Sequence, residues 1–264
     1  MENNNPSVGD DEQRYKGLRK FNLIMGFFHL AQGIAMVILS SDFSLPVTSV
    51  FVEFNAQAMK LEPVLKEVFQ LTIGPVVAGF LFLSALAHFM ISMPGINRWY
   101  VNNLKKGANY ARWIEYSFSS SLMIVVIAMI TGMYDGVSLM LMFFLNAMMI
   151  LFGWMMELHN QRTEKTNWTS FWFGSLAGAI PWVAIAIYLF NAGSETQGPP
   201  TFVYWIFVSL FLFFNVFAIN MVLQYKKVGK WKDYLYGERA YIILSLVAKS
   251  LLAWQVWAGT LRPV

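Results

Sequence analysis

The sequence predicts an all-α membrane protein, a bundle of seven transmembrane helices. Of its 264 residues, 57% are hydrophobic and only 13% are charged, whereas soluble domains carry about 25% charged residues. The apolar residues are gathered into seven blocks, each about 20 residues long and so able to cross a bilayer as a helix. Backbone groups in hydrocarbon must be satisfied within their own segment, so each block is expected to be helical.

The seven predicted spans are separated by mostly short connectors. They lie at approximately residues 21–40, 72–93, 111–132, 136–156, 169–190, 201–224 and 240–260. The polar, acidic residues 1–13 are predicted to form a disordered tail, which leaves residues 14–264 as the seven-helix domain. The first block contains His29 and Gln32 and has no A-x-A-like cleavage site, so we interpret it as a retained span and not as a signal peptide.

The basic residues predict how the bundle is oriented. The N-terminal tail, the second, fourth and sixth connectors and the start of the third span lie on one side and hold fifteen of the nineteen Lys and Arg residues: Arg14, Lys16, Arg19, Lys20, Arg98, Lys105, Lys106, Arg112, Arg162, Lys165, Lys226, Lys227, Lys230, Lys232 and Arg239. The other side holds Lys60, Lys66 and Arg262. Since short cytoplasmic segments are enriched in Lys and Arg, we expect the N-terminus in the cytoplasm and the C-terminus outside. The formal net charge of +4 comes from the same residues, so it does not indicate a nucleic-acid partner.

The first connector, residues 41–71, is long and lies on the extracellular side in this orientation. Residues 47–54 are β-branched and aromatic, as in a strand, and residues 61–71 have the pattern of a short amphipathic helix. Loops of this length usually have a function. A solvated loop resting on the membrane and a small cap or dimer contact both fit the sequence.

Lys249 lies alone in the middle of the last span, about eight residues from either end of an uncharged run between Tyr241 and Trp257. A bare ammonium at that depth costs at least about 2.5–3.5 kcal/mol. Such a lysine is expected to be ion-paired, neutral or covalently occupied. A Schiff base with an aldehyde is the covalent form that lysine chemistry offers, and the charged nitrogen then needs a carboxylate counterion.

Three further ionisable residues are expected at a similar depth. Glu115 lies in the third span, His29 in the first and His88 in the second. Together with Lys249 they predict a polar site in the cytoplasmic half of the membrane, with Glu115 as the counterion. The alternative for each histidine is a hydrogen bond between two helices.

Other polar residues of the spans have simpler interpretations. Arg112 lies one turn before Glu115 and could pair with it. Glu157 and Glu238 lie at span ends and are expected to be solvated. The serines of residues 117–121 could serve close helix packing.

A conjugated chain attached to Lys249 would need an aromatic slot. Ser245 lies one turn before Lys249 on the same helical face. Trp254, Trp182 and Phe214 lie at mid-depth in the seventh, fifth and sixth spans and could wall the slot.

Several longer stretches resemble the heliorhodopsin family. They are FN at 21–22, FHL at 28–30, LSAL at 83–86, HF at 88–89, RWIEYSFSSSLM at 112–123, LFGW at 151–154 and GERAYIILSLVAKS at 237–250. The match runs from the first span to the last. The orientation expected from the basic residues agrees with this family.

The resemblance implies all-trans retinal bound to Lys249, with Glu115 as counterion. It implies a water-containing polar cavity that includes Ser84, His29 and His88. Further positions that match the family are Ser245, Ser119 with the rest of 117–121, Asn146 and Trp154. It also implies a homodimer with a β-structured contact formed by the first extracellular loop, and a slow photocycle without ion transport. The cytoplasmic signalling partner is unknown.

The sequence therefore predicts a light-sensing photoreceptor in the cell membrane and not an enzyme. One alternative is a light-driven proton transporter, which would need a buried acid on the extracellular side of Lys249. Another is a membrane enzyme or transporter that uses Lys249, Glu115 and the two histidines, and it predicts no visible chromophore. The absence of cysteine excludes disulfides and thiol catalysis, and the absence of H-E-x-x-H argues against a zinc site.

Overall fold

The computed structural model describes residues 8–191 and 198–262, and in them it has seven helices long and apolar enough to cross a membrane. The helices are α1 (Val8–Leu39), α2 (Ile73–Ser92), α3 (Pro94–Leu104), α4 (Tyr110–Ile130), α5 (Gly136–Asn160), α6 (Thr169–Asn191), α7 (Thr201–Tyr225) and α8 (Tyr234–Val256). All of them except α3 are membrane-length. A π-helical turn, Trp257–Leu261, extends α8.

The predicted spans agree with these helices within a few residues, except at two ends where helix continues further. Helix α1 begins at Val8, so the prediction of disorder is wrong for residues 8–13, and residues 1–7 lie outside the described part of the chain. Helix α8 begins at Tyr234 and not near residue 240, because Asp233 caps its first turn by accepting from Leu235 N. The short helix α3 within the second connector was not predicted.

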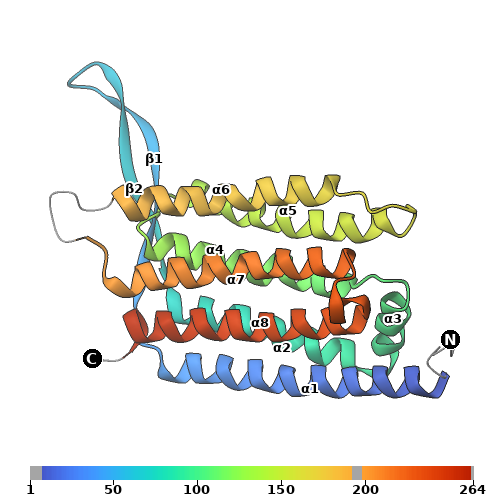
Figure 1. Ribbon diagram of the computed structural model, residues 1–264. Helices are drawn as coiled ribbons and strands as arrows, with labels where there is room; N and C mark the ends of the chain where they lie inside the picture. The colour runs from blue at the N-terminus through green and yellow to red at the C-terminus, as the bar shows by residue number, and fades with distance from the viewer. Residues whose placement is uncertain (1–7, 192–197, 263–264) are drawn as a thin grey trace.

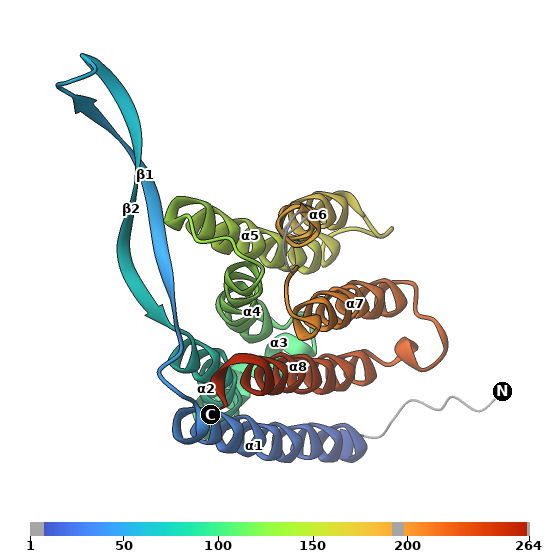
Figure 2. The ribbon, with the colours of Figure 1, turned by 90° about the vertical axis from the view of Figure 1, so that its left-hand side faces the viewer.

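The helices run side by side, and the bundle has two distinct ends (Figure 1). One end, called the basic end here because the Lys- and Arg-rich connectors lie there, contains the start of α1 and the α5–α6 and α7–α8 connectors. The opposite end, called the hairpin end, contains the two strands and the end of α8. Seen from the hairpin end, α4 lies inside the bundle among its neighbours (Figure 2). Its Ile124, Ile127 and Met129 are fully buried in the main apolar core, and among the described spans α4 has the largest buried share.

The first connector is a β-hairpin that runs across the end of the bundle and projects past α5 (Figure 2). Strands β1 (Ser44–Asn55) and β2 (Lys60–Thr72) pair antiparallel, with Val50 opposite Leu65. The prediction of a short helix over residues 61–71 is therefore wrong. As a strand this segment bonds its backbone to β1, and the side chain of Asn55 supports the turn by accepting from Gln57 N and Ala58 N.

The hairpin is fixed to the bundle at two places. Thr48 N donates to Tyr134 O at 2.8 Å, and Ser41 N donates to Leu261 O at 2.8 Å beyond α8. Asp135 begins α5 by accepting from Ser138 N at 2.7 Å and also accepts from Ser49 of β1 at 3.3 Å. The bonds from Ser138 are the main reason why the pKa of Asp135 is lowered. The base of the hairpin is therefore held while its tip extends beyond the helices.

The projecting part of the hairpin has one apolar face. Alternate residues share a face of a strand, and here Val50, Val52 and Phe54 lie opposite Leu65, Pro63 and Leu61. Pro63 is exposed, and the other five residues are 59–67% exposed. The other face carries charged pairs, Lys66 with Glu53 and Lys60 with Glu62. An exposed apolar face of this size is unusual on a protein surface.

Candidate functional site

The Lys249 amine lies inside the bundle and has two polar partners. Its Nζ donates to Ser245 Oγ at 2.8 Å and lies 3.2 Å from Glu115 Oε1. The side chains of Lys249 and Glu115 are 3% and 9% exposed. Nζ also lies 5.0 Å from the centre of the Tyr116 ring. A helical spacing of four residues places Ser245 beside the amine, and α4 supplies the carboxylate from across the bundle.

Glu115 is oriented by a third helix. Ser84 of α2 donates to Glu115 Oε1 at 2.6 Å, the same oxygen that faces Lys249. The Ser84 hydroxyl also lies 3.2 Å from Phe80 O. The structure thus brings together Lys249, Glu115, Ser84 and Ser245, four residues that the sequence had assigned to one site.

The two predicted histidines lie next to this group. The rings of His29 on α1 and His88 on α2 are stacked with centres 5.6 Å apart. His88 Nδ1 lies 2.8 Å from Asn22 Oδ1. Because the Asn22 amide nitrogen donates to Leu18 O, His88 Nδ1 is the donor in this contact. Both ring nitrogens of His29 are buried, and no protein partner is found for them among the described residues. Water is the natural partner for such atoms.

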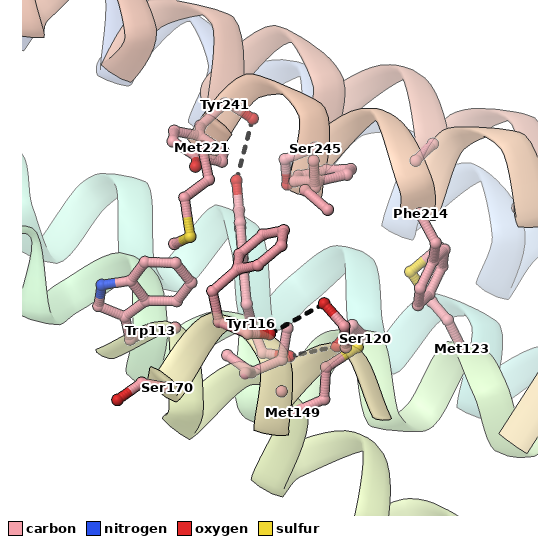
Figure 3. Close-up of a pocket in the computed structure, with 18 of the residues that line it drawn as sticks. Trp113, Tyr116, Ser120, Met123, Met149, Ser170, Phe214, Met221, Tyr241 and Ser245 are labelled. Atoms are coloured by element: carbon pink, nitrogen blue, oxygen red, sulfur yellow. Dashed lines mark hydrogen bonds between the residues drawn. The ribbon is translucent and has the colours of Figure 1, made fainter. Parts of the chain in front are cut away.

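Lys249 lies at the wall of a cavity of about 140 Å³ between α4, α5, α6, α7 and α8. Its largest lining side chains are aromatic residues and methionines: Trp113, Tyr116, Met123, Met149, Phe171, Phe214, Phe217, Met221 and Tyr241. In Figure 3, Trp113 and Phe214 lie toward opposite ends of this cavity with Tyr116 between them. Among the described residues that line it, Lys249 carries the formal charge. The cavity is therefore an apolar slot with an amine at its wall.

Of the three aromatic residues predicted to wall the slot, Phe214 does so. Trp182 lies behind it, with ring centres 5.3 Å apart. Trp254 lies outside the cavity, contrary to the prediction. Trp254 is 37% exposed, and its indole donates to Gln32 Oε1 of α1 at 3.1 Å, because its position on α8 faces α1 rather than α7.

The serines at residues 117–121 of α4 have two different environments. Ser119 is completely buried, and no partner is found for its hydroxyl among the described residues. Asn146 of α5 donates to Ser120 Oγ at 2.8 Å and Ser121 Oγ at 3.1 Å. The run therefore contributes hydrogen bonds between α4 and α5 as well as close packing.

Arg112, Glu157 and Glu238 form a buried charge cluster. The guanidinium donates to Oε1 of both carboxylates, and the side chains are 4%, 2% and 1% exposed. The expectation that both glutamates are solvated is wrong, and Arg112 does not pair with Glu115. Rotation of α5 and α8 turns the two span-end carboxylates inward, where a buried arginine needs acidic partners.

Two residues of the cluster, Arg112 and Glu238, line a second cavity of about 40 Å³. Glu115, Ser84 and Ser245 from the Lys249 site line the same cavity. The sequence did not identify this connection. The available signal was that Arg112 is an arginine inside a span, which requires a counter-charge.

Comparison with known proteins identifies a family. A family model described as Heliorhodopsin matches residues 18–261, which is most of the chain. A search of curated proteins gave no match.

Proposed function

Because the chain belongs to the heliorhodopsin family, a family of retinal-binding light sensors, we propose that Lys249 holds all-trans retinal as a protonated Schiff base. The observation that supports this most directly is a buried amine at the wall of an apolar cavity, 3.2 Å from a carboxylate. When bound, retinal supplies light absorption and isomerisation. The aromatic and methionine walls fit a conjugated hydrocarbon, and Glu115 fits the charge of the attached nitrogen.

The residues of the site have distinct roles in this proposal. Glu115 balances the charge on the Lys249 nitrogen and is held in place by Ser84. Ser245 offers that nitrogen a second acceptor. When the nitrogen moves away from Glu115, the pair is weakened and the nitrogen can release its proton to polar groups of the second cavity, which His88 also lines. The resulting slow relaxation at the basic end is the proposed signal.

The acids of the spans are arranged on one side of Lys249. Glu115, Glu157 and Glu238 lie toward the basic end, whereas the span segments between Lys249 and the hairpin end contain no Asp or Glu. A pump needs proton acceptors and donors on both sides of the nitrogen. We therefore propose a local proton cycle without net transport, with the basic end in the cytoplasm.

The experiment is a paired measurement on one preparation. The purified protein reconstituted with all-trans retinal should gain a visible absorption band, and illuminated vesicles that contain it should show no steady pH change. A steady, uncoupler-sensitive pH change would establish a pump instead. No visible band would exclude the retinal site and leave an enzyme or transporter.

The first variant to compare is Glu115→Gln. It removes the carboxylate and retains the acceptor for Ser84, so the charged Lys249 nitrogen loses about 4 kcal/mol of attraction, the value for two charges at 4 Å in a medium of effective dielectric constant 20. We expect the visible band to change position and to lose most of its height at neutral pH. The measurement is an absorption titration beside Glu164→Gln, an exposed glutamate of the α5–α6 connector. Identical spectra for Glu115→Gln and wild type would remove Glu115 as the counterion.

We also propose that the apolar hairpin face pairs two copies of the chain. Its position past α5 leaves it free of the helices of its own chain (Figure 2), and burial of exposed apolar side chains favours association. The double variant Val52→Lys with Leu65→Glu should halve the particle mass measured by light scattering in detergent. Lys66→Gln, on the charged face, should leave the mass unchanged. A wild-type protein with a monomer mass would refute the dimer.

A further inference from the structure

The buried cluster of Arg112, Glu157 and Glu238 has one more acid than it has bases. Burying a net charge is costly, so uptake of one proton by a carboxylate of the cluster is favourable. The other titratable groups that face it are tyrosines: Tyr100 on α3, Tyr116 on α4, Tyr225 on α7, and Tyr234 and Tyr241 on α8. Burial raises the pKa of Tyr100, the one of these outside the spans, and tyrosines are ordinarily neutral at physiological pH. The tyrosines therefore do not balance the charge.

The carboxylates of Glu157 and Glu238 differ in the number of hydrogen bonds that they accept. Glu157 Oε2 accepts from Asn109 N at 2.8 Å and from Trp113 Nε1 at 2.7 Å, besides the bond of Oε1 to Arg112. Glu238 Oε2 accepts only from Asn109 Nδ2, at 2.6 Å, among the described residues. A carboxylate oxygen has about two lone-pair positions. Within residues 8–191 and 198–262, Glu238 Oε2 thus has one free acceptor position, whereas both positions of Glu157 Oε2 are occupied.

Glu238 is also the carboxylate that faces the second cavity, whose lining contains Glu238 but not Glu157. The cavity volume of about 40 Å³ has room for about three waters at 10–15 Å³ each. Arg112 Nε and Tyr241 Oη, from two residues that line it, are buried, and no partner is found for them in the described part of the chain. Water in the cavity would satisfy them and would connect Glu115 to Glu238.

We propose that Glu238 receives the proton that the Lys249 nitrogen releases, an inference that rests on the proposed function. The N–H bond at Lys249 breaks and its electron pair stays on nitrogen, which becomes neutral. Successive waters each take up one proton and pass one on, and an O–H bond forms at Glu238 Oε2. The negative charge thereby moves from the cluster, which becomes neutral, to Glu115, which remains hydrogen-bonded to Ser84.

His88 is a competing acceptor because it lines the same cavity. A proton on His88 would leave the surplus negative charge of the cluster uncompensated. A proton on Glu238 neutralises it. The charge balance therefore favours Glu238.

The test is infrared difference spectroscopy on the retinal-loaded protein under illumination. Wild type should gain a carboxylic-acid C=O band that shifts in D₂O. Glu238→Gln should lose this band completely, whereas Glu164→Gln should keep it. Glu238→Gln retains an oxygen acceptor for Arg112 and removes the surplus charge, so its unfolding temperature should not fall.

A second readout does not depend on retinal. Acid titration of the retinal-free protein should add one buried carboxylic-acid band that is absent from Glu238→Gln and present in Glu164→Gln. A wild type without a visible band would contradict the proposed function. A normal visible band with the same carboxylic-acid signals in Glu238→Gln and wild type would overturn the role of Glu238 alone, as would loss of the light-induced signal only in His88→Phe.

Discussion

Lys249→Ala is expected to abolish the visible band of the retinal-reconstituted protein. Alanine has no amine, and the described lining of the 140 Å³ cavity offers no other lysine for attachment. The measurement is the absorption spectrum after reconstitution, compared with wild type and with Lys226→Ala, an exposed lysine at the end of α7. A visible band of wild-type height in Lys249→Ala would place the attachment elsewhere.

This substitution also leaves Glu115 without its cation, and breaking a buried pair costs about 3–5 kcal/mol. Loss of the band could then reflect poor folding. The double variant Lys249→Ala with Glu115→Gln removes both charges and retains an acceptor for Ser84. It should unfold close to the wild-type temperature and still show no band, which separates loss of attachment from loss of structure.

Arg112→Met is expected to destabilise the protein strongly. It leaves two buried carboxylates facing each other without a cation, at a cost of about 3–5 kcal/mol. For a chain of this size that corresponds to a fall of roughly 6–20 °C in unfolding temperature. Thermal unfolding of the retinal-free protein measures it, with the exposed Arg98→Met as control.

Further substitutions can show whether unpaired charge causes the lower stability of Arg112→Met. Adding Glu157→Gln and Glu238→Gln to Arg112→Met removes all three charges, and replacing a buried ionic group by neutral residues is often harmless. We expect the triple variant to recover most of the lost stability. A triple variant as unstable as Arg112→Met would mean that the arginine acts by packing on Trp113 and Tyr241, whose ring centres lie 4.4 Å and 4.0 Å from its guanidinium carbon.

The site shows how far sequence reasoning reaches. Lys249, Glu115, His29 and His88 were placed at one depth by counting along their spans, and the structure has them as neighbours. Trp254 was predicted to face the cavity but lies on another side of its helix. Depth follows from position in a span, whereas the direction of a side chain follows from the rotation of the helix about its axis.

The hairpin and the charge cluster illustrate the same limit. Residues 61–71 fit an amphipathic helix when taken alone, and they form a strand because β1 supplies a partner for their backbone. Glu157 and Glu238 fit solvated span ends when taken alone, and they are buried because α4 presents Arg112 between them. In each case a neighbour far away in the chain decided the outcome.

The sequence by itself determined the class of protein, the number of spans and the unusual depth of Lys249, because these depend on what each segment requires in lipid. The tertiary structure alone decided which carboxylates pair with Arg112, and that one cavity is lined by residues of both groups. Such choices depend on which helices are adjacent and how each is rotated. Those properties are set by the packing of the whole bundle, and no single segment encodes them.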